Sequence, residues 1–131
     1  MTKNIKWNTT IYVENGPTFA YDDAISSEAV DILNFQVAKG TTSEVNVDVQ
    51  PGSLDALNFL YIKCDGPPEV KYKFNDGTSD GKVLVLDRDH LITSTEIIKL
   101  FEKAPKLIKF TNSNTEKDAN IKIVVGRKAT H

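Results

Sequence analysis

The chain has 131 residues, of which 40% are hydrophobic and 26% are charged. That length corresponds to one domain, and the composition is typical of a folded globular protein. It excludes collagen, coiled coils, disordered tails and disulfide scaffolds. The formal net charge is −2 and the pI is about 5.7, which argues against a nucleic-acid binder. We therefore expect a single domain over residues 1–131 with no nucleic-acid partner.

The small net charge hides an uneven distribution along the chain. Residues 1–65 have 4 Lys and 9 Asp or Glu, a net charge of −5. Residues 66–131 have 10 Lys, 2 Arg and 9 Asp or Glu, a net charge of +3. An ordinary mixed surface explains this difference, and charge complementarity between neighbouring copies is the alternative.

Cysteine use and hydropathy indicate the compartment. Cys64 is the single cysteine, so no intrachain disulfide forms, which fits assembly in a reducing cytoplasm. No stretch approaches the roughly 18 apolar residues of a membrane span. The first residues have no apolar run after their lysines, so we expect no signal peptide and no membrane partner.

The first elements are a strand and an irregular segment. Ile5, Trp7, Thr9 and Ile11 alternate with polar residues, which predicts a half-buried strand. Asn15-Gly16-Pro17 breaks this pattern. The polar, mildly acidic residues that follow predict an extended arm or loop within residues 14–29.

Alternating apolar residues continue through the middle of the chain. They predict strands over residues 30–39, 45–49, 57–64, 69–74 and 82–86, separated by Gly-, Pro- and Asx-rich turns. The run from Leu57 to Cys64 is almost continuously apolar, which indicates a central strand that is covered on both faces.

One short helix interrupts the strands near residues 95–103. Ile97, Ile98, Leu100 and Phe101 have helical spacing, and Pro105 ends the segment. Two further strands, over residues 106–111 and 119–125, complete the chain. About eight short strands with frequent turns predict an all-β fold, an antiparallel β-sandwich or a jelly-roll-like barrel.

Catalytic and metal-binding motifs are sparse, so we do not expect an enzyme or a cofactor. Asp87, Asp89 and His90 form the densest polar cluster, although a solvated turn after a strand needs the same residues. The segment that contains Asp76 and Asp80 resembles part of a calcium loop but lacks EF-hand spacing, and a hairpin turn requires the same residues. Asp76, Asp80, Asp87 and Asp89 are therefore the weak metal candidates, and turns remain the favoured interpretation.

Flat aromatic side chains leave one alternative function. Trp7 and Tyr12 lie on opposite parities of the first strand, so one of them is a candidate for an exposed ring that stacks on a sugar. The sequence thus keeps a carbohydrate-binding module as the alternative. A small hydrolase is a more remote alternative.

Four segments carry a resemblance to a known class of proteins. They are Leu57–Pro67 (LNFLYIKCDGP), Val70–Gly77 (VKYKFNDG), Ile108–Ser113 (IKFTNS) and Ala119–Gly126 (ANIKIVVG). Together they resemble the small β-sandwich virion proteins of tailed bacteriophages, over residues 30–126.

The resemblance implies a viral structural protein. Such proteins decorate capsids or act as head and tail accessories, and they assemble as homo-oligomers. Residues 1–29 have no counterpart in the resemblance, and no catalytic residues carry over. We therefore expect a non-enzymatic capsid decoration or minor virion component, assembled in the host cytoplasm. Its partners are expected to be copies of itself, for example in a trimer, and other virion proteins.

Overall fold

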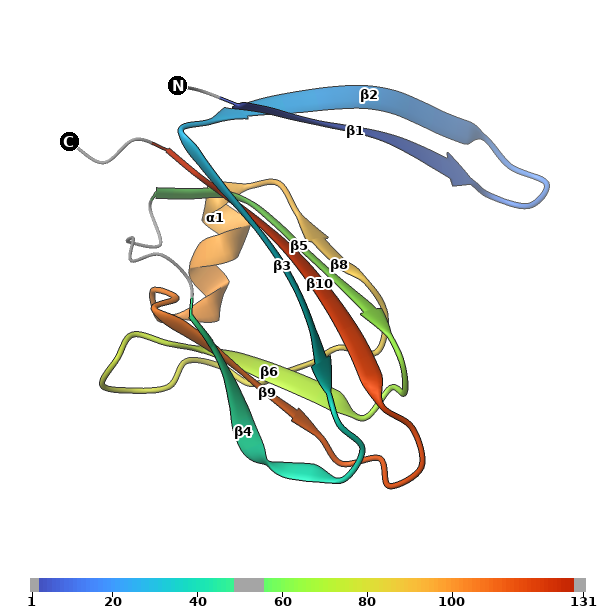
Figure 1. Ribbon diagram of the computed structural model, residues 1–131. Coiled ribbons are helices and arrows are strands. Elements are labelled where there is room, and N and C mark those ends of the chain that lie inside the picture. Colours follow the sequence, from blue (N-terminus) through green and yellow to red (C-terminus); the bar gives the residue numbers. More distant parts are fainter. Residues whose placement is uncertain (1–2, 49–55, 129–131) are drawn as a thin grey trace.

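A computed structural model describes residues 3–48 and 56–128 (Figure 1). These residues form ten strands, a short α-helix and a 3-10 turn. The elements are β1 (Lys3–Tyr12), β2 (Thr18–Ser27), β3 (Ala29–Val37), β4 (Thr41–Asp48), β5 (Leu57–Asp65), β6 (Val70–Asn75), β7 (Leu84–Val85), β8 (His90–Ile92), α1 (Thr95–Ile98), η2 (Lys99–Phe101), β9 (Leu107–Asn112) and β10 (Ala119–Arg127).

Eight of these strands form two four-stranded antiparallel sheets that face each other. Their strand orders are β3-β10-β5-β8 and β4-β9-β6-β7. The chain from β3 to β10 follows one long hairpin that is rolled into two layers. In this hairpin β3 pairs with β10, β4 with β9, β5 with β8 and β6 with β7. This is the strand order of a jelly roll. The all-β sandwich that the turn spacing predicted is therefore confirmed, with strands β3 to β10. The described residues contain ten strands where about eight were expected, because β2 and β8 were not predicted and β1 lies outside the sandwich.

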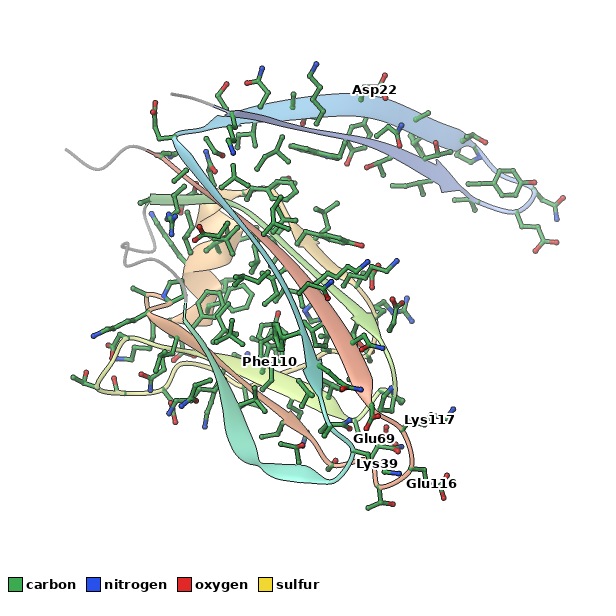
Figure 2. All side chains as sticks on the ribbon, viewed as in Figure 1. Asp22, Lys39, Glu69, Phe110, Glu116 and Lys117 are labelled. Atoms are coloured by element: carbon green, nitrogen blue, oxygen red, sulfur yellow. The ribbon has the colours of Figure 1, made fainter. Side chains whose placement is uncertain are left out.

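The core fills the space between the two sheets. Alternate residues of each strand point inward, as the period of two requires, and Phe110 lies between the layers in Figure 2. Tyr72 stacks on Phe110 with ring centroids 5.6 Å apart. The alternating apolar residues of β6 and β10 are all buried: Val70, Tyr72, Phe74, Ile121, Ile123 and Val125.

The short helix closes one end of the sandwich. Its two inward residues, Ile98 and Phe101, are three positions apart and are buried, whereas Ile97 and Leu100 are exposed. Phe101 stacks on Phe74 with ring centroids 4.5 Å apart. The helical segment predicted near residues 95–103 is thus present, and it ends at Phe101.

The segment expected to be an extended arm or loop contains a strand over residues 18–27, which the sequence pattern had not predicted. Thr18–Ser27 pairs with β1 in continuous antiparallel register, from Lys3 opposite Ser27 to Tyr12 opposite Thr18. The small and acidic residues of β2 have low strand propensity, so its conformation depends on the hydrogen bonds that β1 supplies.

The hairpin of β1 and β2, residues 3–27, forms an arm that projects from the sandwich. Figure 1 shows the arm leaving the body at the start of β3 and extending beyond the ends of the sheets. Among the described strands, β1 and β2 pair only with each other. A turn over residues 13–17 closes the tip, where Asn15 adopts a positive φ of 59° and Gly16 N–H donates to the Val13 carbonyl at 2.8 Å.

Candidate functional site

The arm has one apolar face and one polar face, because opposite residues in an antiparallel pair share a side. The apolar face consists of Ile5, Trp7, Thr9 and Ile11 from β1 with Phe19, Tyr21, Asp23 and Ile25 from β2. The polar face includes Lys6, Asn8, Thr10, Tyr12, Ala20, Asp22 and Ala24. Figure 2 shows Asp22 pointing away from the sandwich, so the apolar face is turned toward it.

The root of the apolar face packs on the outer surface of the β3-β10-β5-β8 sheet. The Trp7 ring lies 5.4 Å from the Phe59 ring, which is buried beneath it. A Cβ added at Gly126 would lie 2.9 Å from Ile5 Cδ1 and 2.6 Å from Ser27 Oγ. Only glycine therefore leaves room for the arm to approach β10 this closely.

Polar contacts fix the point where the arm joins the body. Ser27 Oγ donates to Asn58 Oδ1 at 2.9 Å, and Asn58 Nδ2 donates to the Ser26 carbonyl at 3.0 Å. Glu28 N–H donates to the Arg127 carbonyl at 2.7 Å. Asn58 is 2% exposed, so these bonds satisfy polar groups that water does not reach.

The distal half of the arm leaves its apolar face uncovered. Four large side chains there remain about half exposed: Ile11 at 49%, Val13 at 47%, Phe19 at 55% and Tyr21 at 51%. Among residues 9–21, Glu14 is the only charged residue. A contiguous apolar surface rimmed by polar residues marks an interaction site on soluble proteins.

A second apolar surface crosses the outer face of the β3-β10-β5-β8 sheet. We call it the apolar row, and it consists of Ile32, Val124, Tyr61 and Leu91, which are neighbours in register across the four strands. Ile32 is 75% exposed and Leu91 is 46% exposed. Val124 and Tyr61 of the row lie two residues along β10 and β5 from Gly126 and Phe59, which the arm root covers.

A pair of lysines borders the apolar row on its far side. Lys63 and Lys122 are directly opposite in the β5–β10 register. Like charges in this arrangement destabilise a sheet unless an anion lies close to them. Within the described ranges, neither ammonium group has an ion-pair partner.

A cavity of about 470 Å³ lies between β7, β8 and the short helix. Its walls are mainly apolar and include Leu84, Ile92 and Phe101, with His90 as a polar member. His90 Nδ1 lies 2.7 Å from the Tyr72 hydroxyl. Burial lowers the pKa of His90, while Asp87 and Asp89 act in the opposite direction. Burial also raises the pKa of Tyr72 well above its ordinary value.

The two carboxylates beside His90 have separate partners. Asp89 accepts hydrogen bonds from the Tyr61 hydroxyl at 2.9 Å and from Cys64 N–H at 3.3 Å. Asp87 Oδ1 lies 4.0 Å from His90 Nε2. Asp89 therefore links β5 to the turn before β8.

Asp76 and Asp80 hold the loop after β6 in shape. Asp76 accepts backbone hydrogen bonds from Ser79 at 2.8 Å and Thr78 at 2.9 Å, which lower its pKa. Asp80 accepts from Asn75 at 2.7 Å and forms ion pairs with Lys73 at 2.9 Å and Lys109 at 3.4 Å. The bonds from Asn75 and Lys73 lower the pKa of Asp80 to about 2.

The metal candidates are thus divided between two loops. Asp76 and Asp80 lie after β6, and Asp87 and Asp89 lie before β8. Over residues 3–48 and 56–128, no three His, Cys, Asp or Glu side chains are grouped as metal ligands.

Trp7 and Tyr12, the carbohydrate candidates, lie on opposite faces of the arm. Trp7 is half-buried against Phe59 at the root, and Tyr12 is 70% exposed near the tip on the polar face. The two rings therefore do not form one stacking platform.

The sequence pattern did not indicate the exposed apolar surfaces of the arm and sheet. Phe19 and Tyr21 alternate with Ala20 and Asp22, which was a usable signal for β2. The apolar row gave no local signal, because each strand contributes one residue and only the sheet register joins them.

No protein-family model, curated protein or solved structure matches the chain. In the part of the chain that the structure describes, no helix has the length and apolar character needed to span a membrane.

Proposed function

We propose that the protein is a virion structural protein, a capsid decoration or minor virion component that assembles as a homo-oligomer. The observation that carries this proposal is the projecting arm, whose distal apolar face is left uncovered by residues 3–48 and 56–128. Ile11 and Phe19, for example, are 49% and 55% exposed there. Burying such side chains against a neighbour is worth about 25 cal/mol per Å² of apolar surface.

The jelly-roll strand order supports this proposal. This architecture occurs in viral capsid domains as well as in lectins and cupins, so the fold alone does not select the function. The resemblance to the β-sandwich virion proteins of tailed bacteriophages favours the capsid role among these. We place the assembled protein in the virion, built in the host cytoplasm.

The oligomeric state of the full chain tests the proposal. Size-exclusion chromatography with light scattering should give a mass that is a multiple of 14.6 kDa. A monomer over the whole accessible concentration range would contradict assembly. Cryo-electron microscopy of the virions that contain the protein should place it on the head or tail, and absence from purified virions would contradict the viral role.

A further inference from the structure

We infer that the distal apolar face of the arm docks on the apolar row of a second copy of this chain, and that two copies exchange arms reciprocally. This inference rests on the proposed homo-oligomer and names the surfaces that join the copies. The distal face comprises Ile11, Val13, Phe19 and Tyr21, and the apolar row is Ile32, Val124, Tyr61 and Leu91.

The contact at the arm root shows that these two kinds of surface fit each other. Trp7 and Ile5 of the apolar face already lie on Phe59 and Gly126 of the outer face of the sheet. The apolar row continues that outer face by two residues along each strand. The distal arm continues the same apolar face, but it extends beyond its own sandwich (Figure 1). A neighbouring sheet would therefore extend a contact that the chain already makes.

The charge at the arm tip is complementary to the charges that border the apolar row. Glu14 at the arm tip is the single charge of residues 9–21. Lys63 and Lys122 lie side by side just beyond the apolar row. An arm that crosses the row in the direction of β5 and β10 brings the carboxylate toward the two ammonium groups, which relieves their mutual repulsion.

The exposed areas of the distal face and the apolar row favour two reciprocal arm-to-sheet contacts over a single one. Taking about 200 Å², the value for an aromatic side chain, as the upper bound for each residue, the exposed fractions give at most about 400 Å² on the distal face and about 250 Å² on Ile32 and Leu91. One arm-to-sheet contact is thus smaller than a stable interface. Two such contacts, related by a twofold axis, bury at most about 1,300 Å², which reaches the lower end of the standard range.

Cysteine cross-linking between different chains tests the inference. Ile11→Cys is made in one chain and Ile32→Cys in another, both with Cys64→Ala, and the two are mixed and oxidised mildly. We expect a covalent heterodimer of one arm variant and one sheet variant, identified by a tag on one chain. Ile11→Cys mixed with Leu100→Cys is the control, since Leu100 is 66% exposed on η2, outside the row. This control pair should give only background cross-linking.

Three outcomes would overturn the arm exchange. One is that the Ile11 and Ile32 pair gives no more heterodimer than the control pair. Another is preferential cross-linking to Leu100, which would place the arm on the groove beside the short helix. The third is an intrachain disulfide in a chain with both Ile11→Cys and Ile32→Cys, which would show that the arm folds onto its own sheet.

A charge reversal separates this inference from the proposed function. Glu14→Lys should weaken the oligomer measured by light scattering, and adding Lys63→Glu and Lys122→Glu should restore it. If the wild-type protein is an oligomer that Glu14→Lys and Ile11→Ser leave intact, the arm exchange is wrong and the homo-oligomer stands. If the wild-type protein is a monomer, both fail.

Discussion

At the residue scale, Asn58 is the side chain that joins the arm to the sandwich. It accepts a hydrogen bond from Ser27 Oγ and donates one to the Ser26 carbonyl, and it is 2% exposed. Asn58→Ala leaves both partners without this side chain, and we expect a loss of about 1–3 kcal/mol in the free energy of unfolding. Urea unfolding followed by circular dichroism measures this loss.

The same variant should also loosen the arm root. Trp7 is the only tryptophan in the chain and lies on Phe59, so its emission reports whether the root is docked. We expect a shift of the Trp7 emission to longer wavelength in Asn58→Ala. Asn34→Ala, an exposed position on the same sheet, is the control and should change neither signal. An unchanged emission in Asn58→Ala would contradict the role given to this residue.

His90 makes a second residue-scale prediction, which concerns pH. Burial holds its pKa below the ordinary value of about 6.5. The unfolded chain therefore binds a proton at a higher pH than the folded chain, so stability is complete above pH 6.5 and declines as the pH falls through that value. Chemical denaturation between about pH 7.5 and pH 5.5 measures the decline.

His90→Asn isolates this effect. The asparagine side chain keeps a hydrogen-bonding group near Tyr72 but does not titrate, so the free energy of unfolding should become nearly independent of pH in that window. The only other histidine is His131, which lies outside the described residues. A pH dependence equal to that of the wild-type protein would show that His90 is not its source.

At the element scale, Phe101 is one of the two buried side chains that anchor the short helical segment. Phe101 is 3% exposed and stacks on Phe74 of β6, whereas its neighbour Leu100 is 66% exposed. Phe101→Ala should cost about 3–5 kcal/mol, because it leaves a cavity in the core. Leu100→Ala should cost less than about 0.5 kcal/mol. Urea denaturation measures the free energy of unfolding of the two variants. Similar losses in both would contradict the packing of Phe101 against Phe74.

The elements also show what sequence patterns predict and what they miss. Val70, Tyr72 and Phe74 alternate with polar residues, so β6 and its buried face were predicted correctly. β8 has only three residues, too few for a period to be recognised. β2 is rich in Ala, Ser and Asp, and its strand conformation comes from pairing with β1. Pairing with another strand decided both of these elements, and the alternation of Phe19 and Tyr21 was the local signal available for β2.

The candidate site likewise combines residues that have a local sequence signal with contacts that only the folded chain creates. Trp7 was noticed because it is aromatic, but its contact with Phe59 joins residues 52 positions apart and required the folded chain. Ile32 shares its side of the strand with the polar residues Asn34 and Gln36, and the register makes it a neighbour of Val124. The apolar row is therefore a property of the sheet and of no single segment.

At the scale of the whole molecule, arm exchange would couple folding to association. A protein whose native state is a dimer becomes more stable as its concentration rises, because mass action favours the associated form. Each tenfold increase in concentration adds about 1.4 kcal/mol per mole of dimer. We therefore expect the melting temperature of the wild-type protein to rise by several degrees over a hundredfold range of concentration.

The arm variant Phe19→Ser should remove this concentration dependence. Phe19 is 55% exposed at the distal end of the arm, so its replacement leaves the packing of the sandwich intact. Differential scanning calorimetry at several concentrations should give melting temperatures that rise for the wild-type protein and stay constant for the variant. Leu100→Ser is the matched control, since it removes an equally exposed apolar side chain outside the proposed interface, and it should keep the wild-type slope. A flat wild-type curve would mean that folding does not depend on a second copy, and a sloping Phe19→Ser curve would place the association elsewhere than on the arm.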